Sequence, residues 1–328
     1  MLTRRDFLGS TGAAILTGVS GANAQTYPDH PIRILVGYPA GGGVDIVARL
    51  LGEPMKADLG QTIVVENRTG ASAMIASGAV AKATPDGHTL LMAASGEVAI
   101  NQHLYKEKMA YDPQRELEPV ALVGIVPCVI VVASTTPVKT PAELIAYAKA
   151  NPGKLSFSSS GVGNPQQLAG ELMNSMAGTD VLHVPYRGSA PAVTDVAVGA
   201  VTMSFSSLAA ALPLIQDGKL RAVAVTSKER MPQLPDVAPL NEGAPGLARY
   251  ELLNWFGMFA TAGTPPAVIN RLNGIVNTAL KDKALAEKLI VQGIVPKPMT
   301  APEFKSFVGS ETQKFAQIIT QAKITLPN

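Results

Sequence analysis

The chain has 328 residues, of which 47% are hydrophobic and 16% are charged, and its formal net charge is +2. It is long enough to bury a sizeable core in two domains of ordinary size, which excludes an intrinsically disordered protein. With a net charge this close to zero, the chain has no strong positive field, which argues against a nucleic acid or an anionic membrane surface as its partner. Cys128 is the single cysteine, so an intrachain disulfide is excluded, and its apolar neighbours predict a buried small hydrophobe.

Residues 1–24 have the features of an export signal. The motif TRRDFLG resembles the twin-arginine signal, and a weakly apolar stretch follows it at 8–19. This stretch is too short and too rich in glycine and threonine to span a hydrocarbon core of about 30 Å. The small-x-small sequence at 22–24 then predicts cleavage after Ala24. We therefore expect a soluble mature protein in the periplasm.

Beyond the leader, short β-branched runs alternate with alanine- and leucine-rich segments of helical length. This alternation predicts an α/β fold with parallel sheets and crossover helices. Strands are expected at 32–36, 62–66, 89–93, 129–133, 155–159, 181–185, 202–206 and 221–226. Helices are expected at 44–59, 73–83, 141–150, 166–176 and 191–198, with a last helix opened by Pro302 and Glu303. The apolar run 120–133, interrupted by Gly124 and Pro127, suits buried strands better than a membrane helix.

Three of the expected strands lead through a loop of small residues directly into a helix. The loops read YPAGGGVD, SSSGVGNP and PYRGSAP. A helix N-terminus presents unpaired N–H groups and a partial positive charge, so such a loop can hold a carboxylate or a phosphate. In open α/β sheets these loops gather at the carboxyl ends of the strands. The three loops together predict an anion-binding cleft, although each one alone is also explained as a tight turn.

A secreted serine hydrolase is the main alternative to a binding protein. Neither the residues around Ser95 nor the run 158–160 fits the GxSxG nucleophile elbow. The glycine loops lack both the lysine of a Walker motif and the third glycine of a dinucleotide fingerprint. The four histidines stand far apart in the sequence and form no metal-binding spacing; they are His30, His88, His103 and His183. We therefore predict a protein that is not an enzyme and that needs no metal ion or cofactor.

At the same loops the sequence resembles a known family. The segments that carry the resemblance include ILVGYPAGGGVDIVAR, VVENRTGA, ATPDGHTLLM, SSSGVGNPQQLAGELM and HVPYRGSAPAVTDVAVGAV. They are similar to substrate-binding proteins of the tripartite tricarboxylate transporter, the TctC-like Bug family, and the likeness runs from about Tyr27 to the end. The resemblance implies a two-lobed periplasmic binding protein of the type II class, which binds a small organic acid between its lobes. It also implies delivery of that acid to a permease with one large and one small membrane subunit.

The resemblance assigns ligand-binding residues to both walls of the cleft. From lobe 1 it implies Tyr38, Ala40, Gly41, Gly42, Gly43, Asn67 and Ser95. From lobe 2 it implies Ser159, Ser160, Gly161, Gly163, Tyr186, Arg187 and Ser204, with Ser206 at the end of the last run. Ser72 and Ala73 stand where the family usually has glycines, and Gln167 stands where a histidine often precedes the LAGE stretch. These departures leave the identity of the ligand open.

Several of these residues also have a purely structural interpretation. Asp45 and Arg49 lie one helical turn apart, which is typical of a surface ion pair near a helix N-terminus. Asn67 can brace its loop, Arg187 can point at water, and the two tyrosines can belong to the core. The sequence leaves these alternatives open.

The expected division of the chain follows from a second crossing between the lobes. We expect lobe 1 to comprise 25–126 and 250–328, and lobe 2 to comprise 127–249. Two crossings form a hinge, so closure of the cleft around the ligand is the expected motion. The protein is expected to act as a monomer, with a ligand sensor outside transport as an alternative role.

Overall fold

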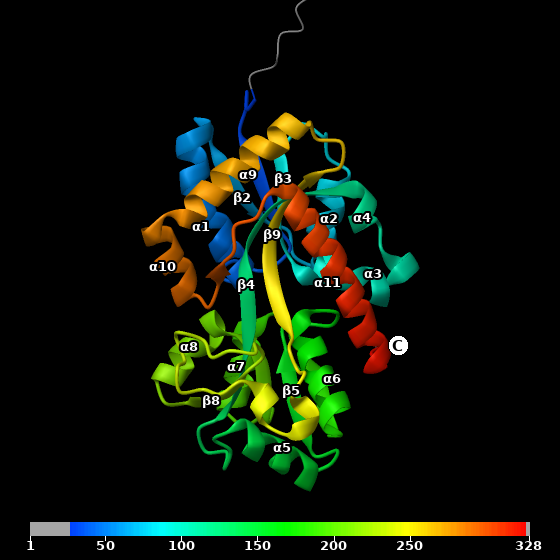
Figure 1. The fold of residues 1–328 in the computed structure, drawn as a ribbon, viewed down its shortest axis with the longest axis vertical. Coiled ribbons are helices and arrows are strands. Elements are labelled where there is room, and N and C mark those ends of the chain that lie inside the picture. Colours follow the sequence, from blue (N-terminus) through cyan, green and yellow to red (C-terminus); the bar gives the residue numbers. More distant parts are fainter. Residues whose placement is uncertain (1–26, 326–328) are drawn as a thin grey trace, which may run out of the picture.

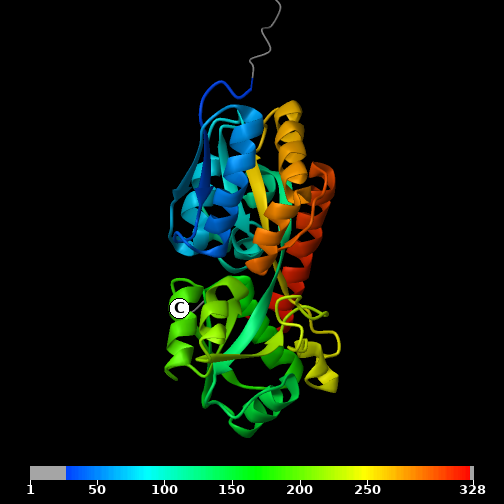
Figure 2. The same cartoon turned by 90° about the vertical axis from the view of Figure 1, so that its left-hand side faces the viewer.

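The computed structural model describes residues 27–325, so the predicted leader and its cleavage site lie outside the described residues. Two α/β lobes are stacked along the long axis of the molecule, and two long strands pass between them (Figures 1 and 2). This architecture confirms the predicted two-lobed α/β fold. Within the described part of the chain, no helix is long and apolar enough to cross a membrane.

The sheet of lobe 1 has β1 (Ile32–Val36) next to one of its edges. This strand pairs in parallel with β2 (Ile63–Asn67) on one side and with β3 (Thr89–Ala94) on the other. The antiparallel strands β9 (Leu253–Thr261), β4 (Leu117–Ala133) and β10 (Val295–Pro296) extend the sheet beyond β3. Because β1, β2 and β3 run the same way, their carboxyl ends lie at one edge of the sheet, which faces lobe 2 (Figure 1).

Helices cover both faces of the lobe 1 sheet. Alternate residues of β1 point to opposite faces, so that Ile34 packs in one apolar cluster and Leu35 in the other. The cluster around Ile34 includes α1 (Gly43–Leu59), α9 (Pro266–Lys281) and α10 (Lys283–Val291). The cluster around Leu35 includes α2 (Met74–Ala81) and α11 (Ala301–Gln321). Shorter helices complete this lobe: α3 (Asn101–Leu104), α4 (Pro113–Glu116) and a π-helical turn, η2 (Gly96–Ile100).

Lobe 2 repeats the same plan on a second sheet. The strand β5 (Leu155–Ser159) pairs in parallel with β6 (Val181–Pro185) on one side and with β7 (Met203–Ser207) on the other. The second half of β4 pairs antiparallel with both β7 and β8 (Leu220–Val225). The helices of this lobe are α5 (Pro141–Ala150), α6 (Pro165–Ala177), α7 (Ser189–Ala197) and α8 (Leu208–Gln216).

The strand β4 differs most from its prediction. Instead of separate strands in the run 120–133, one strand of 17 residues extends from Leu117 to Ala133 and joins both sheets. Gly124 leaves room for β10 beside the strand, because a Cβ there would stand only 2.5 Å from the carbonyl oxygen of Val295 on β10. Pro127 falls where pairing with β9 ends, so its missing N–H does not break the ladder.

Helix boundaries follow the capping residues. The helix predicted at 141–150 is found there as α5, and the side chain of its N-cap Thr140 accepts a hydrogen bond from Glu143 N. The last helix begins at Ala301, where Thr300 and Glu303 form a capping box. In contrast, the helix predicted at 73–83 covers only 74–81, because Ala71, Ser72 and Ala73 have φ values of 47°, 52° and 67°.

Candidate functional site

A cavity of about 400 Å³ lies between the two lobes, at the carboxyl ends of their parallel strands. Its size is in the range of pockets that enclose small organic molecules. On the lobe 1 side the lining comprises 38–44, Ile46, Ala94, Asn254 and Phe256. On the lobe 2 side it comprises Ser160, 164–166, 187–191, Ser207, Ala209 and Ala210.

The lobe 1 wall is formed by the glycine loop between β1 and α1. Gly41 adopts φ +80°, a left-handed conformation that glycine takes without strain, and Gly42 is the N-cap of α1. No side chain caps this helix, so the N–H groups of its first turn have no side-chain acceptor, and its first residues, Gly43 and Val44, line the cavity. The loop residues Ala40, Gly41, Gly42 and Gly43 all line the cavity, as the sequence indicated.

Behind this loop, Asp45 holds the backbone in place. The residue is buried, and its carboxylate accepts hydrogen bonds from Gly41 N at 2.9 Å and from the Arg49 guanidinium at 2.9–3.1 Å. Asn67 Nδ2 donates to the same carboxylate at 2.9 Å and to Tyr38 O at 3.0 Å. Burial alone would raise the pKa of Asp45, but the hydrogen bonds from Arg49, Gly41 and Asn67 outweigh it and lower the pKa. Asp45 and Asn67 therefore lie outside the lining and brace the loop.

Tyr38 lines the cavity and is held by a buried acid that sequence reasoning missed. Its hydroxyl donates to Glu97 Oε2 at 2.8 Å, and Glu97 Oε1 accepts from Ala94 N at 2.9 Å. The side chain of Glu97 is fully buried at the start of η2, and this burial raises its pKa to about 7. No short motif marks Glu97, because a single glutamate between small and apolar residues resembles a surface position in sequence.

The serine loop of lobe 2 is organised by glutamines. Ser160 N donates to Gln166 Oε1 at 2.7 Å, and Gln166 Nε2 donates to Ser189 Oγ at 3.0 Å. Asn164 caps α6 by accepting from Gln167 N at 3.0 Å, while its Nδ2 donates to Ser160 Oγ at 2.9 Å. The N-terminus of α6 is therefore capped by protein, which differs from the expectation that all three loops leave their N–H groups free.

The third loop brings the N-terminus of α7 to the cavity. Gly188, its N-cap, has φ +125°, and no side chain caps the helix. Arg187 lines the cavity, is exposed, and makes no ion pair or hydrogen bond with the described residues. Tyr186 lies outside the lining, where its hydroxyl donates to Asp195 Oδ2 at 2.5 Å and its pKa is raised to about 12 by burial and by Asp195.

The charge of the lining is positive. Among the described residues that line the cavity, Arg187 is the only charged side chain, and aspartate and glutamate are absent from the lining. Three helix N-termini without a side-chain cap add their partial positive charges, that of α1 from lobe 1 and those of α7 and α8 from lobe 2. Asn254, a lining residue that was not predicted, accepts from Ser95 Oγ at 3.0 Å and leaves its amide N–H groups free for the cavity.

The remaining predicted residues lie outside the lining. The Ser95 hydroxyl donates to Asn254 Oδ1 at 3.0 Å, the Ser204 hydroxyl donates to Ser158 O, and both serines are buried. Gly161 and Gly163 shape the serine loop at φ +149° and +74°, and a Cβ on Gly163 would stand 2.9 Å from Asn101 Oδ1 of lobe 1.

Ser159 bonds His183 Nε2 at 2.7 Å, the pairing that a serine hydrolase uses. Ser159 is fully buried, however, and both residues lie outside the cavity lining. Burial lowers the pKa of His183 to about 4, which makes it a poor base, and no carboxylate of residues 27–325 bonds its other ring nitrogen.

The sequence matches the family described as the tripartite tricarboxylate transporter family receptor over residues 47–324. The chain belongs to this family. Among solved structures, the receptor is similar to Rpa4515 of R. palustris with adipate, with a TM-score of 0.86 and 32% identity over 91% of this chain and 99% of that one. It is also similar to the periplasmic binding protein BugD, with a TM-score of 0.82 and 34% identity over 91% and 99% of the two chains. MatC from Rhodopseudomonas palustris with bound malate gives a TM-score of 0.81 and 30% identity over 89% and 100%. These similarities confirm the family resemblance and the type II fold.

Proposed function

We propose that this receptor captures a small organic acid in the cavity between its lobes and delivers it to the large and small membrane subunits of a tripartite tricarboxylate-type permease. The observation that carries this proposal is the set of donors around the cavity. Three helix N-termini without a side-chain cap border it, one from lobe 1 and two from lobe 2, together with the unpaired Arg187, and the lining contributed by residues 27–325 contains no acidic side chain. Such a set favours an anion, because each donor offers an N–H group without a competing protein carboxylate.

The rest of the lining favours an organic anion over a bare phosphate. Ile46, Phe256 and Ala210 present apolar surface to the cavity, which suits a hydrocarbon skeleton. Two similar receptors were solved with adipate and malate, both dicarboxylates. We therefore place mono- and dicarboxylates of this size first among the ligand classes.

The proposed ligand-binding residues are those predicted residues that line the cavity, together with four that sequence reasoning missed. From the prediction they are Tyr38, Ala40, Gly41, Gly42, Gly43, Ser160 and Arg187. The added residues are Gln166, Ser189, Asn254 and Phe256. Asn67, Ser95, Ser159, Gly161, Gly163, Tyr186 and Ser204 are proposed to act on the ligand only through the loops that they hold.

We propose that the lobes close around the ligand by bending at two crossings. Lobe 1 would comprise 25–126 and 250–328, and lobe 2 would comprise 127–249. The first boundary is supported by β4, whose pairing changes from β9 to β7 between Pro127 and Cys128. Near the second boundary, Leu252 N still bonds Thr226 O of lobe 2, and the chain enters β9 directly afterwards, at Leu253.

The proposed location is the periplasm, after export and cleavage at Ala24. The twin-arginine motif and the family of periplasmic receptors support this location. Because a receptor reads both arginines of such a signal, replacing Arg4 and Arg5 by lysine should leave the precursor in the cytoplasm. Continued processing and export of the double variant would contradict the twin-arginine route.

The experiment that tests the function is a ligand screen on the purified protein by thermal shift and calorimetry. Mono- and dicarboxylates, aromatic acids and acidic amino acids form the panel, and the matching alcohols and amides are the controls. We expect at least one carboxylate to bind with micromolar affinity or better, about 8 kcal/mol. Affinity should change little with salt, because fixed dipoles in a closed cleft are screened less than exposed charges.

Tight binding of a neutral or cationic solute in the cavity, with no carboxylate bound, would contradict the anion proposal. Turnover of an ester or amide that is abolished by changing Ser159 or Ser160 would instead support the hydrolase alternative.

A further inference from the structure

A second cluster of potential ligand atoms lies at the far end of lobe 1 from the cavity. Asp29 and His30 immediately precede β1, and His88 immediately precedes β3. The two strands are parallel neighbours, and Arg33 N bonds His88 O at 2.8 Å, so the residues before them lie side by side. Since β1 spans five residues, about 16 Å at the usual rise of a strand separate this cluster from the glycine loop.

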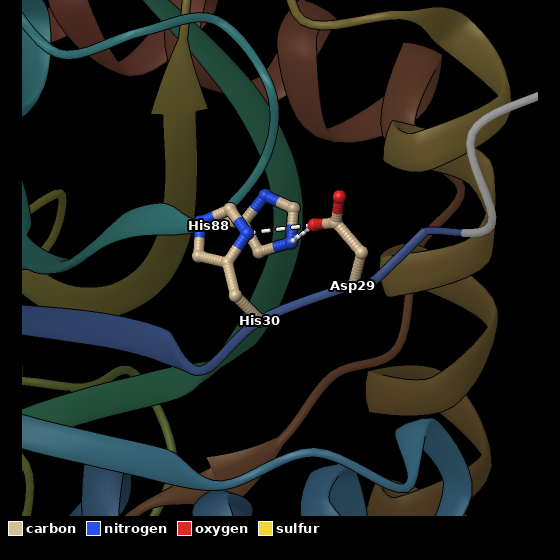
Figure 3. A group of neighbouring side chains, drawn as sticks. All are labelled: Asp29, His30 and His88. Atoms are coloured by element: carbon tan, nitrogen blue, oxygen red, sulfur yellow. Dashed lines mark hydrogen bonds and ion pairs between the residues drawn. The ribbon is translucent and has the colours of Figure 1, made fainter.

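The three side chains converge on one point, as Figure 3 shows. Asp29 Oδ1 lies 2.6 Å from His30 Nδ1 and 3.3 Å from His88 Nε2. The two imidazole rings are stacked, with centroids 3.6 Å apart and an angle of 11° between their planes. One ligand atom from each residue lies within 4.8 Å of the other two.

His88 is the unusual member of this cluster. It is only 7% exposed, and both of its ring nitrogens are buried without a hydrogen-bond partner. Carboxylate oxygens of Asp29 and Asp86 stand 3.3 Å from Nε2 and Nδ1, but neither contact has the alignment of a hydrogen bond. An unsatisfied buried polar group is costly, which suggests that a further atom completes this site.

We propose that Asp29, His30 and His88 bind a divalent transition metal ion, with zinc as the reference ion. Two imidazole nitrogens and one carboxylate oxygen form a common zinc-binding set, and water would complete a tetrahedron. Asp86 is placed to orient His88 through Nδ1, as carboxylates commonly do behind a metal-bound histidine.

Binding requires one local adjustment. Zinc bonds of about 2.0–2.1 Å place tetrahedral ligand atoms roughly 3.3 Å apart, so Asp29 and His30 must separate and the His30 ring must turn out of the stack. The His30 side chain is 56% exposed and is free to make this movement. The bound ion would join the segment before β1 to the turn before β3, and would stabilise lobe 1 without reaching the organic-acid cavity.

The test uses the untagged protein after removal of metal with a chelator, and the probe is Zn²⁺ alone. Calorimetry should show one ion per chain with micromolar affinity or tighter, and Zn²⁺ should raise the melting temperature until chelator is added back. His30→Ala should weaken binding by about 100-fold, and Asp86→Asn by about 10-fold. His103→Ala, which changes a histidine on α3, is the control and should bind Zn²⁺ like the wild type.

Two outcomes would overturn the proposal. One is the absence of saturable Zn²⁺ binding at Zn²⁺ concentrations 100-fold above the expected micromolar dissociation constant. The three side chains would then form ion pairs only. The other is unchanged affinity in His30→Ala, a surface variant that should fold even if His88→Asn does not. Binding of Co²⁺ with the visible absorption of tetrahedral nitrogen coordination, lost in His30→Ala, would support the same site independently. Organic-acid binding and Zn²⁺ binding are measured separately, so a negative organic-acid screen would not affect the Zn²⁺ result.

Discussion

The buried Glu97 gives the protein a specific dependence of stability on pH. Its pKa is raised from 4.5 to about 7 by burial, so the folded chain keeps a proton that the unfolded chain releases above about pH 4.5. Stability from this group is therefore fully present below pH 4.5 and is lost as pH rises to about 7. At 1.36 kcal/mol per pKa unit, the loss between these limits is about 3 kcal/mol.

Glu97→Gln isolates this contribution, because the amide is always neutral and still reaches Tyr38 and Ala94 N. Urea unfolding at several pH values from 4.5 to 8 should show the variant gaining about 3 kcal/mol relative to the wild type as pH rises. Glu53→Gln, which changes an exposed glutamate of α1, is the control and should keep the wild-type slope because it retains Glu97. Parallel profiles for the wild type and Glu97→Gln would refute the argument.

Three further substitutions test the cavity, each by calorimetry with the carboxylate that binds the wild type. Arg187→Ala should lower the binding free energy by about 2 kcal/mol or more if closure buries this cation. Arg68→Ala, outside the lining, is the control and should leave affinity unchanged. A loss below about 0.5 kcal/mol in Arg187→Ala would show that Arg187 stays solvated. In Gly42→Val, φ of −76° suits valine and the new Cβ would lie 3.2 Å from Pro39 O, so the melting temperature is measured first to check folding. A folded variant should lose affinity, and wild-type affinity would exclude the α1 N-terminus as a binding element. Ser72→Ala removes a hydrogen bond of 2.9 Å from Ser72 of lobe 1 to Val162 O of lobe 2. It should weaken carboxylate binding about fivefold, about 1 kcal/mol. Unchanged affinity would show that this hydrogen bond contributes equally with and without ligand.

The sequence predicts well those parts of the fold that depend on local patterns. The helix 141–150 was predicted to the residue, because Thr140 and Pro141 fix its start by local capping. The strand β9 was not predicted. Its residues are buried on both faces, so apolar and polar side chains do not alternate, and its two long-range partners give no signal in one sequence.

The candidate site shows the same division between local and long-range features. The glycine and serine loops were recognisable, because small residues before a helix have a local mechanism. Sequence reasoning missed Gln166, Glu97 and Asn254. Their roles depend on hydrogen bonds to residues that are distant in the sequence, which no local pattern indicates. His30 and His88 were dismissed as far apart for the same reason, although the parallel pairing of β1 and β3 brings them into contact.

The strand β4 has a consequence for how this receptor unfolds. Its residues from Leu117 to Pro127 pair with β9, and those from Cys128 to Ala133 pair with β7 and β8, so one continuous strand belongs to both sheets. One apolar cluster also contains both Leu91 of lobe 1 and Phe157 of lobe 2. We therefore expect the two lobes, which share a strand and an apolar cluster, to melt together in a single cooperative transition.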